Sequence, residues 1–228
     1  MTISPADGDR NATLAKAGQE LVEQLLKVGI NGFGPFKSAA ESAAEALSGR
    51  TTEQAVSTLI RNHAAAAGAQ GFVTNLGGFI AMPLTLPANV GASYLVQTHL
   101  AGAIAAVHGH DLDSEEVRTA VLLCLVGNAG TEVLKQVGVK VGTQVSMTVI
   151  KRIPITVIRQ INKKVGFMLV AKYGTKRAVI TLAKGVPLVG GAIGGGMDAT
   201  ATWAVGSLAD KAFTVSQDSA ETAALTPA

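Results

Sequence analysis

Histidine is the residue type whose spacing first suggests chemistry in this chain. His108 and His110 alternate in the segment His108-Gly109-His110-Asp111, and imidazoles at that spacing are able to chelate zinc. A zinc site also needs further ligands and groups that orient them. The other two histidines, His63 and His99, lie in apolar helical segments with no carboxylate at metal-ligand spacing. We therefore predict no metal site, and expect a helix to end at His108-Gly109, before a turn.

The other reactive groups form no catalytic pattern. Cys124 is the single cysteine and lies in the apolar run Ala120 to Val126, so we expect a buried, inert thiol. The glycine run Gly190 to Gly196 follows no predicted strand and precedes no Lys-Ser or Lys-Thr pair, which argues against a phosphate-binding loop. Glycines at this spacing favour close helix packing instead. We predict no catalytic residue and no cofactor.

Asp198 is the ionisable residue with the most unusual setting. It is the only charged residue in the glycine-rich apolar segment from Gly185 to Leu208. A carboxylate in such surroundings is costly unless it is paired. We interpret it as half of a structural ion pair, with Lys184 or another basic residue as its partner.

The candidate residues above would be positioned by helices, and some of these helices have an unusual composition. Residues 62–110 contain no Lys, Arg, Asp or Glu, although 15% of the chain is charged. Pro83 and Pro87 divide this stretch into two segments, each near the length of a bilayer span. Each segment carries uncharged polar residues at helical spacing: Gln70 and Thr74 in the first, and Asn89, Ser93 and Gln97 in the second. Because such stripes are able to hydrogen-bond to each other, we predict a packed helical pair within a bundle rather than a transmembrane hairpin.

Helical periodicity extends over most of the chain. Apolar residues recur at helical spacing in 14–28 and 153–173, Thr51 with Gln54 forms a capping-box signal, and no strand pattern is visible. Hydrophobic residues reach 48% while aromatic residues are only 4%. We predict an all-α, single compact multi-helix bundle with glycine-rich, largely charge-free central and C-terminal helices. Residues 14–213 would form the domain, between a flexible tail at 1–13 and a disordered tail at 214–228.

Charge is segregated along the chain. Between Val133 and Met197 there are eleven Lys or Arg residues and no Asp or Glu, which indicates an anionic partner. Nucleic acid is disfavoured because Phe167 and Tyr173 are the only aromatic residues there, whereas an anionic membrane surface uses both the charges and the apolar faces. The residues expected to bind that surface are Lys151, Arg152, Arg159, Lys163, Lys164, Lys172, Lys176 and Arg177.

The cellular location is predicted from the N-terminal residues. Met1 to Thr13 is polar and lacks a basic region followed by an apolar core, so no signal peptide is expected. We predict a cytoplasmic protein, peripheral to the inner face of the membrane.

Four glycine-rich segments carry a family resemblance. They are GINGFGPFKSA at 29–39, GAQGFVTNLGGFIAMPLTLPANV at 68–90, HGHDLDSEEVRTAVLLCLVGNAG at 108–130, and GVPLVGGAIGGGMDATATWAVGSLADKAF at 185–213. In these segments the chain resembles the EcsC family of bacterial proteins. The resemblance implies a helical, cytoplasmic, membrane-associated protein with no assigned reaction, and it supplies no catalytic residues.

Two functions follow as hypotheses. The first is a non-enzymatic peripheral membrane protein that assists a membrane or envelope complex. The alternative is a carrier or enzyme whose charge-free helices enclose a lipid-like ligand. The polar groups expected to line that pocket are Asn75, Asn89, Gln97, His99 and Asp198. The oligomeric state stays open.

Overall fold

The chain folds into helices. The computed structural model describes residues 5–32, 37–76, 88–142, 144–182 and 187–214, and within them the side chains of 13–32, 37–69, 93–142, 144–171 and 196–214. Across these ranges there are nine helices and no strand, which confirms the all-α prediction. They are α1 (Pro5–Asn31), α2 (Ala39–Leu47), α3 (Thr52–Leu76), α4 (Ala88–Val107), α5 (Glu115–Val126), α6 (Ala129–Gln136), α7 (Met147–Ile150), α8 (Ile155–Leu182) and α9 (Pro187–Phe213).

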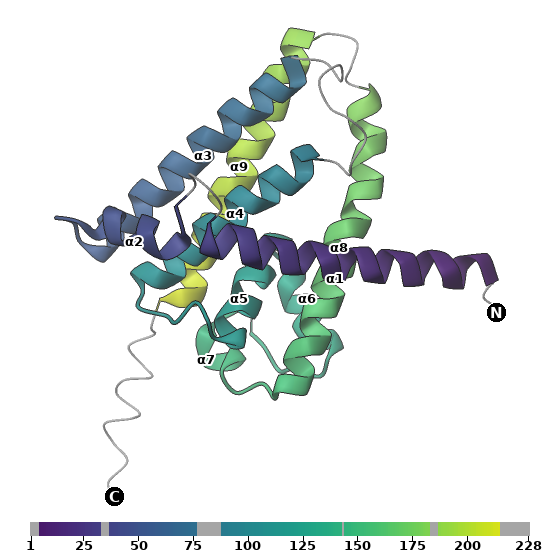
Figure 1. The fold of residues 1–228 in the computed structure, drawn as a ribbon, viewed down its shortest axis with the longest axis horizontal. Coiled ribbons are helices and arrows are strands. Elements are labelled where there is room, and N and C mark those ends of the chain that lie inside the picture. Colours follow the sequence, from purple (N-terminus) through teal and green to yellow (C-terminus); the bar gives the residue numbers. More distant parts are fainter. Residues whose placement is uncertain (1–4, 33–36, 77–87, 143, 183–186, 215–228) are drawn as a thin grey trace, which may run out of the picture.

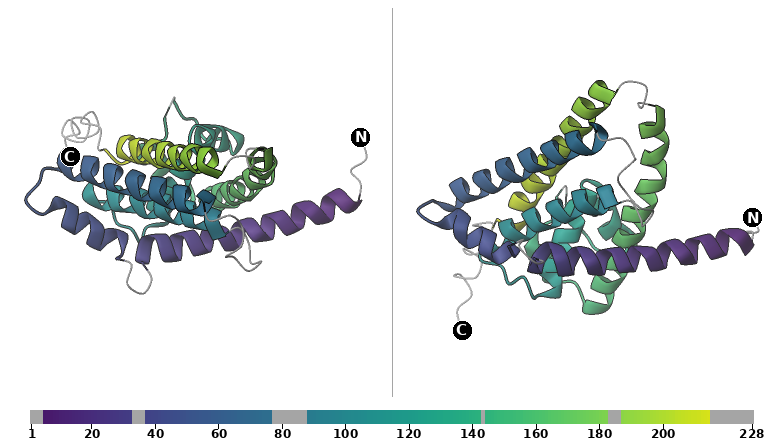
Figure 2. Two further views of the ribbon diagram at one scale, coloured as in Figure 1. Left: turned by 90° about the horizontal axis from the view of Figure 1, so that it is seen from above. Right: turned by 45° about the horizontal axis from the view of Figure 1, so that its top comes forward.

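The long helices cross around a short central one. Helix α3 lies alongside α9, α4 packs against both, and α1 crosses α8 (Figures 1 and 2). Helix α5 contacts α4, α8 and α9. The N-terminal end of α1 projects beyond the other helices in every view. No helix in the described ranges has the length and apolar character needed to cross a membrane.

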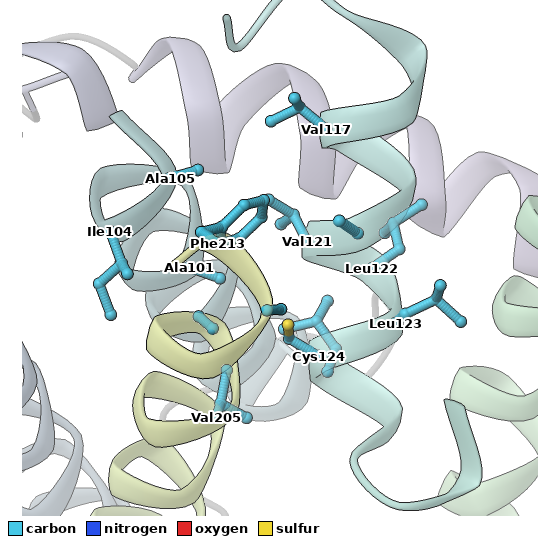
Figure 3. Close-up of a cluster of buried hydrophobic side chains, with 14 of the residues drawn as sticks. Ala101, Ile104, Ala105, Val117, Val121, Leu122, Leu123, Cys124, Val205 and Phe213 are labelled. Carbon is cyan, nitrogen blue, oxygen red and sulfur yellow. The ribbon is translucent and has the colours of Figure 1, made fainter. Parts of the chain in front are cut away.

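The core surrounds α5. Every residue from Thr119 to Val126 is buried, as the absence of a polar face in this segment predicts. Side chains of α4 and the end of α9 pack against it, and Phe213 is completely buried among them (Figure 3). A helix enclosed on all sides in this way needs neighbours along its whole length, so α5 sets the positions of the helices around it.

Local sequence signals account for the helix ends. Thr51 and Gln54 form the predicted capping box, in which the side chain of each residue accepts a hydrogen bond from the backbone N–H of the other. Ser38 and Glu41 form a second one at α2, and Ser114 caps α5 through the backbone N–H of Val117. Helix α4 ends at Val107, and Gly109 follows with φ of 77°. The turn predicted at His108-Gly109 is therefore confirmed.

One sequence expectation differs from the structure. Helix α1 begins at Pro5, so part of the segment expected to be a flexible tail is helical. Helices α3 and α4, which carry the two charge-free segments, pack against each other, and α3 also packs along α9. The buried Gln97 amide donates to the hydroxyl of Thr202 on α9 (3.5 Å). The side chains of Gln70, Thr74 and Asn89 lie outside the described residues.

Glycines allow the helix backbones to touch. A Cβ at Gly18 of α1 would lie 2.5 Å from the carbonyl carbon of Gly166 in α8. At the α3–α9 interface, a Cβ at Gly206 would lie 2.6 Å from Cγ1 of Ile60. No Cβ fits at such distances, so these helix pairs approach more closely than any larger residue permits.

Alanine at Gly166 and at Gly196 should have opposite effects. Gly166→Ala should lower the free energy of unfolding by about 1–3 kcal/mol, because the new methyl group meets the backbone of α1. Gly196→Ala, in α9 with nothing within 4 Å of the added atom, should raise it by up to about 1 kcal/mol through helix propensity. Urea unfolding followed by circular dichroism measures both. Equal effects of the two substitutions would contradict the close contact.

Candidate functional site

The basic residues of α7 and α8 form an exposed surface. Ile158, Ile161 and Val165 are completely buried on one side of α8, which leaves the opposite side of this helix facing outward. The cationic side chains exposed there and in the turn before it are Lys151, Arg152, Arg159, Lys163 and Lys164. We refer to these five residues as the basic face. Lys172, Lys176 and Arg177 continue along α8, but their side chains lie outside the described residues.

Most cations of the basic face have no partner. Elsewhere Lys37 pairs with Glu45, Arg118 with Asp113 and Lys135 with Glu132. On the basic face, Lys164 donates to the side-chain carbonyl of Gln136 (3.1 Å). The other four make no hydrogen bond or salt bridge in the part of the chain that the structure describes. Lys151 lies near Glu116, and Glu23 lies across a groove from Arg159 and Lys163, but no ion pair is formed with either acid in the described part. The four cations are exposed, so an outside anion can reach them.

One apolar side chain lies within the basic face. Ile155 is 42% exposed and precedes Arg159 and Lys163 by one and two helical turns. Residues 155, 159 and 163 follow the i, i+4, i+8 spacing of one helix face, so Ile155 lies on the same face as these two cations.

A shallow groove also lies at this end of α8. Its volume is about 280 Å³, and it is lined by Val139, Lys140, Val149, Arg152, Ile153 and Pro154. The lining combines two cations with aliphatic carbon, as does the rest of the surface. Such a surface is suited to anions carried on apolar molecules.

Among the pocket residues expected from the sequence, the two on α4 face different neighbours. Gln97 and His99 point from α4 in different directions, since Gln97 bonds to Thr202 of α9 and His99 bonds to α1 and α2. Asp198 is half-buried and engaged in an interaction of its own. The side chains of Asn75 and Asn89 lie outside the described residues, as does Lys184, the expected partner of Asp198.

His99 joins three helices through one imidazole ring. Its Nδ1 lies 3.0 Å from the carbonyl oxygen of Gly29, and its Nε2 lies 2.9 Å from the hydroxyl of Ser42. A carbonyl only accepts, so Nδ1 carries the proton, and in the neutral ring Nε2 accepts from Ser42. The bond satisfies a carbonyl in the last turn of α1, which the helix itself leaves unpaired. A serine that donates to histidine is also the geometry of an activated nucleophile, but neither groove in the described part is lined by this pair.

The remaining histidines are held in similar ways. His63 stacks on His99, with 5.3 Å between the ring centroids. His108 contacts the carboxylate of Asp210, and His110 donates to the carbonyl oxygen of Phe213, each at 2.8 Å. These two residues tie the end of α4 to the end of α9. Three or more His, Cys, Asp or Glu groups arranged to hold a metal are not found among the described residues.

Cys124 lies in the core beside α9 (Figure 3). Burial raises the pKa of its thiol to about 12. At neutral pH it is therefore protonated and a poor nucleophile, as the apolar run around it predicts.

Comparison with known proteins identifies a family. The model of the EcsC protein family matches residues 12–215, which is most of the chain. No curated protein and no solved structure matches.

The half-buried histidines predict loss of stability in mild acid. Burial lowers the pKa of His63, His99 and His110 below the ordinary value of 6.5. Below that pH the unfolded chain binds more protons than the folded chain, so stability present above pH 6.5 falls as the pH drops. Carboxylates with a lowered pKa, such as Glu41, make stability depend on pH only below their ordinary pKa of 4.5. They therefore do not contribute to the loss expected between pH 6.5 and that value.

Urea titrations between about pH 7.5 and about pH 5.5 measure this loss. We expect the unfolding midpoint to fall with pH in the natural chain and to fall less in a His63→Gln, His110→Gln variant. A midpoint that stays constant or rises as the solution is acidified would contradict the assignment.

Proposed function

The chain belongs to the EcsC protein family, and from that premise we propose that it binds peripherally to an anionic membrane surface through the basic face of α7 and α8. We place it at the inner face of the membrane, where it assists a membrane or envelope complex without catalysing a reaction. The observation that carries the proposal is the set of exposed, unpaired cations with Ile155 among them. Anionic lipids supply the opposite charge together with an apolar layer beneath it.

The strength of this interaction follows from the number of charges. Each Lys or Arg near an anionic leaflet contributes about 1 kcal/mol, so the five cations supply about 5 kcal/mol. By themselves they would give a dissociation constant of about 0.2 mM. Insertion of Ile155 into the headgroup region adds apolar burial to this attraction. Binding of this kind is reversible and weakens as salt screens the charges.

The alternative of an enclosed lipid-like ligand draws less support. Gln97 and His99, two of its expected pocket residues, have partners within the protein and face different helices. Two grooves on the described surface instead lie beside basic residues.

Vesicle flotation tests the basic face. At low ionic strength the protein should co-float with vesicles of phosphatidylglycerol mixed with phosphatidylcholine, and remain at the bottom with phosphatidylcholine alone. Charge removal from the basic face should abolish co-flotation, through the substitutions Lys151→Gln, Arg152→Gln, Arg159→Gln and Lys163→Gln.

The control removes the same number of charges elsewhere. It uses exposed cations without partners outside the basic face, in the variant Lys16→Gln, Lys27→Gln, Arg61→Gln and Lys211→Gln. This variant should retain most of the binding, because the four positions are spread over α1, α3 and α9 and leave every cation of α7 and α8 in place. Equal losses in the two variants would show that net charge alone matters, and failure of the natural chain to float would refute the proposal.

Ile155→Ser tests the apolar contribution. Burying an isoleucine side chain is worth about 1.5–3 kcal/mol, so its removal should weaken vesicle binding about tenfold. Because Ile155 is already partly exposed in solution, the unfolding midpoint should hardly change. Unaltered vesicle affinity would show that Ile155 does not enter the membrane surface.

A further inference from the structure

A second groove lies between α1 and α8. It is an open surface groove of about 410 Å³, and both helices line it. The residues around it are Gln19, Val22, Glu23, Leu26, Arg159, Asn162 and Lys163. It is a property of the tertiary structure, because its two walls are far apart in the sequence.

The groove begins where the two helices touch. Gly18 and Gly166 bring the backbones together at the crossing, and the helices diverge on either side of it (Figure 1). The lining residues of α1 follow Gly18 by up to about two turns, and those of α8 precede Gly166 by a similar length. Val22 is buried and Leu26 is half-buried, so they supply aliphatic carbon beneath the charged rim.

The α8 wall offers hydrogen-bond donors. Arg159 and Lys163 are exposed and have no partner in the described part of the chain. Between them, Asn162 accepts a hydrogen bond at its Oδ1 from the buried hydroxyl of Thr119 (2.9 Å). Since the carbonyl side of this amide is engaged toward α5, its NH₂ group is left to face the groove. The wall therefore combines a guanidinium, an ammonium and an oriented amide, a set suited to phosphate oxygens.

The α1 wall offers acceptors. Gln19 and Glu23 are exposed along the opposite side. No salt bridge joins Glu23 to Arg159 or Lys163 across the described groove, so the two walls stay separate. A ligand that fits both walls carries a negative charge for α8 and a hydroxyl donor for α1.

We propose that this groove binds the headgroup of an anionic phosphodiester lipid that bears hydroxyl groups beyond its phosphate, as a glycerol headgroup does. The phosphate contacts Arg159, Lys163 and the amide of Asn162, while a headgroup hydroxyl donates to Glu23. The start of the acyl region lies over Val22 and Leu26. This assignment rests on the proposed membrane association and gives the basic face a specific lipid partner.

Calorimetric titration with soluble lipids tests the groove apart from any membrane. The probe is dihexanoyl phosphatidylglycerol below its micelle concentration, and the comparison ligands are dihexanoyl phosphatidylcholine and glycerol 3-phosphate. Phosphatidylglycerol should bind saturably. Phosphatidylcholine should bind about tenfold more weakly because its headgroup donates no hydrogen bond, and glycerol 3-phosphate more weakly because it lacks the acyl chains.

Two variants with equal loss of charge make the test specific. Arg159→Gln with Lys163→Gln removes the cations of the groove, and should weaken phosphatidylglycerol binding at least about tenfold. Arg61→Gln with Lys211→Gln removes one arginine and one lysine from α3 and α9, outside both grooves and the basic face, and should leave the affinity nearly unchanged. All four side chains are exposed, so circular dichroism should show intact folds.

The outcomes separate the groove from membrane association. If the groove and control variants bind phosphatidylglycerol equally well, or the natural chain binds both lipids equally, the groove assignment is overturned. If the natural chain co-floats with anionic vesicles but binds no soluble lipid, the groove fails while the peripheral association stands. If it binds soluble phosphatidylglycerol but does not float, the groove stands and the peripheral association fails.

Discussion

Close approach of helix backbones is the constraint on which this structure depends. Only 4% of the residues are aromatic, so the side chains cannot fill wide gaps between helices. The chain compensates with small residues at the crossings, as at Gly18 with Gly166 and at Gly206 with Ile60. Alanine, valine and leucine are then large enough to complete a dense core around α5. The groove between α1 and α8 follows from the same contact, because helices that touch at one point diverge beyond it.

Polar groups inside this core are satisfied by partners on other helices. Gln97 bonds to Thr202, Thr119 bonds to Asn162, and His99 closes the last turn of α1. Each bond would be lost if a helix shifted along its axis, whereas contacts between aliphatic side chains tolerate such sliding. These bonds therefore contribute to a single register of the helices. They also explain why uncharged polar residues interrupt segments that are otherwise apolar enough to resemble membrane spans.

Segregation of charge leaves one surface different from the rest. Acids elsewhere neutralise nearby cations, as in the pairs made by Lys37, Arg118 and Lys135. The region from Val133 to Met197 has no acid, so beyond Lys135, which reaches back to Glu132, neighbours in sequence offer its cations no counter-ion. Packing of α8 then turns its apolar stripe inward and its cations outward. The proposed attraction to anionic lipid follows from this arrangement, with Ile155 as its apolar component.

Sequence alone determined the helical class, the burial of Cys124 in its apolar run, the turn after α4 and the acid-free region, because each depends on local periodicity, capping residues or composition. It also carried the family resemblance that the comparison confirmed. It did not determine which helices pack together. The partners of Gln97 and His99 lie in segments distant along the chain, and the exposure of Ile155 depends on which side of α8 meets the core. The α1–α8 groove was likewise decided only by tertiary structure, because a crossing of two helices brings together residues that no local pattern connects.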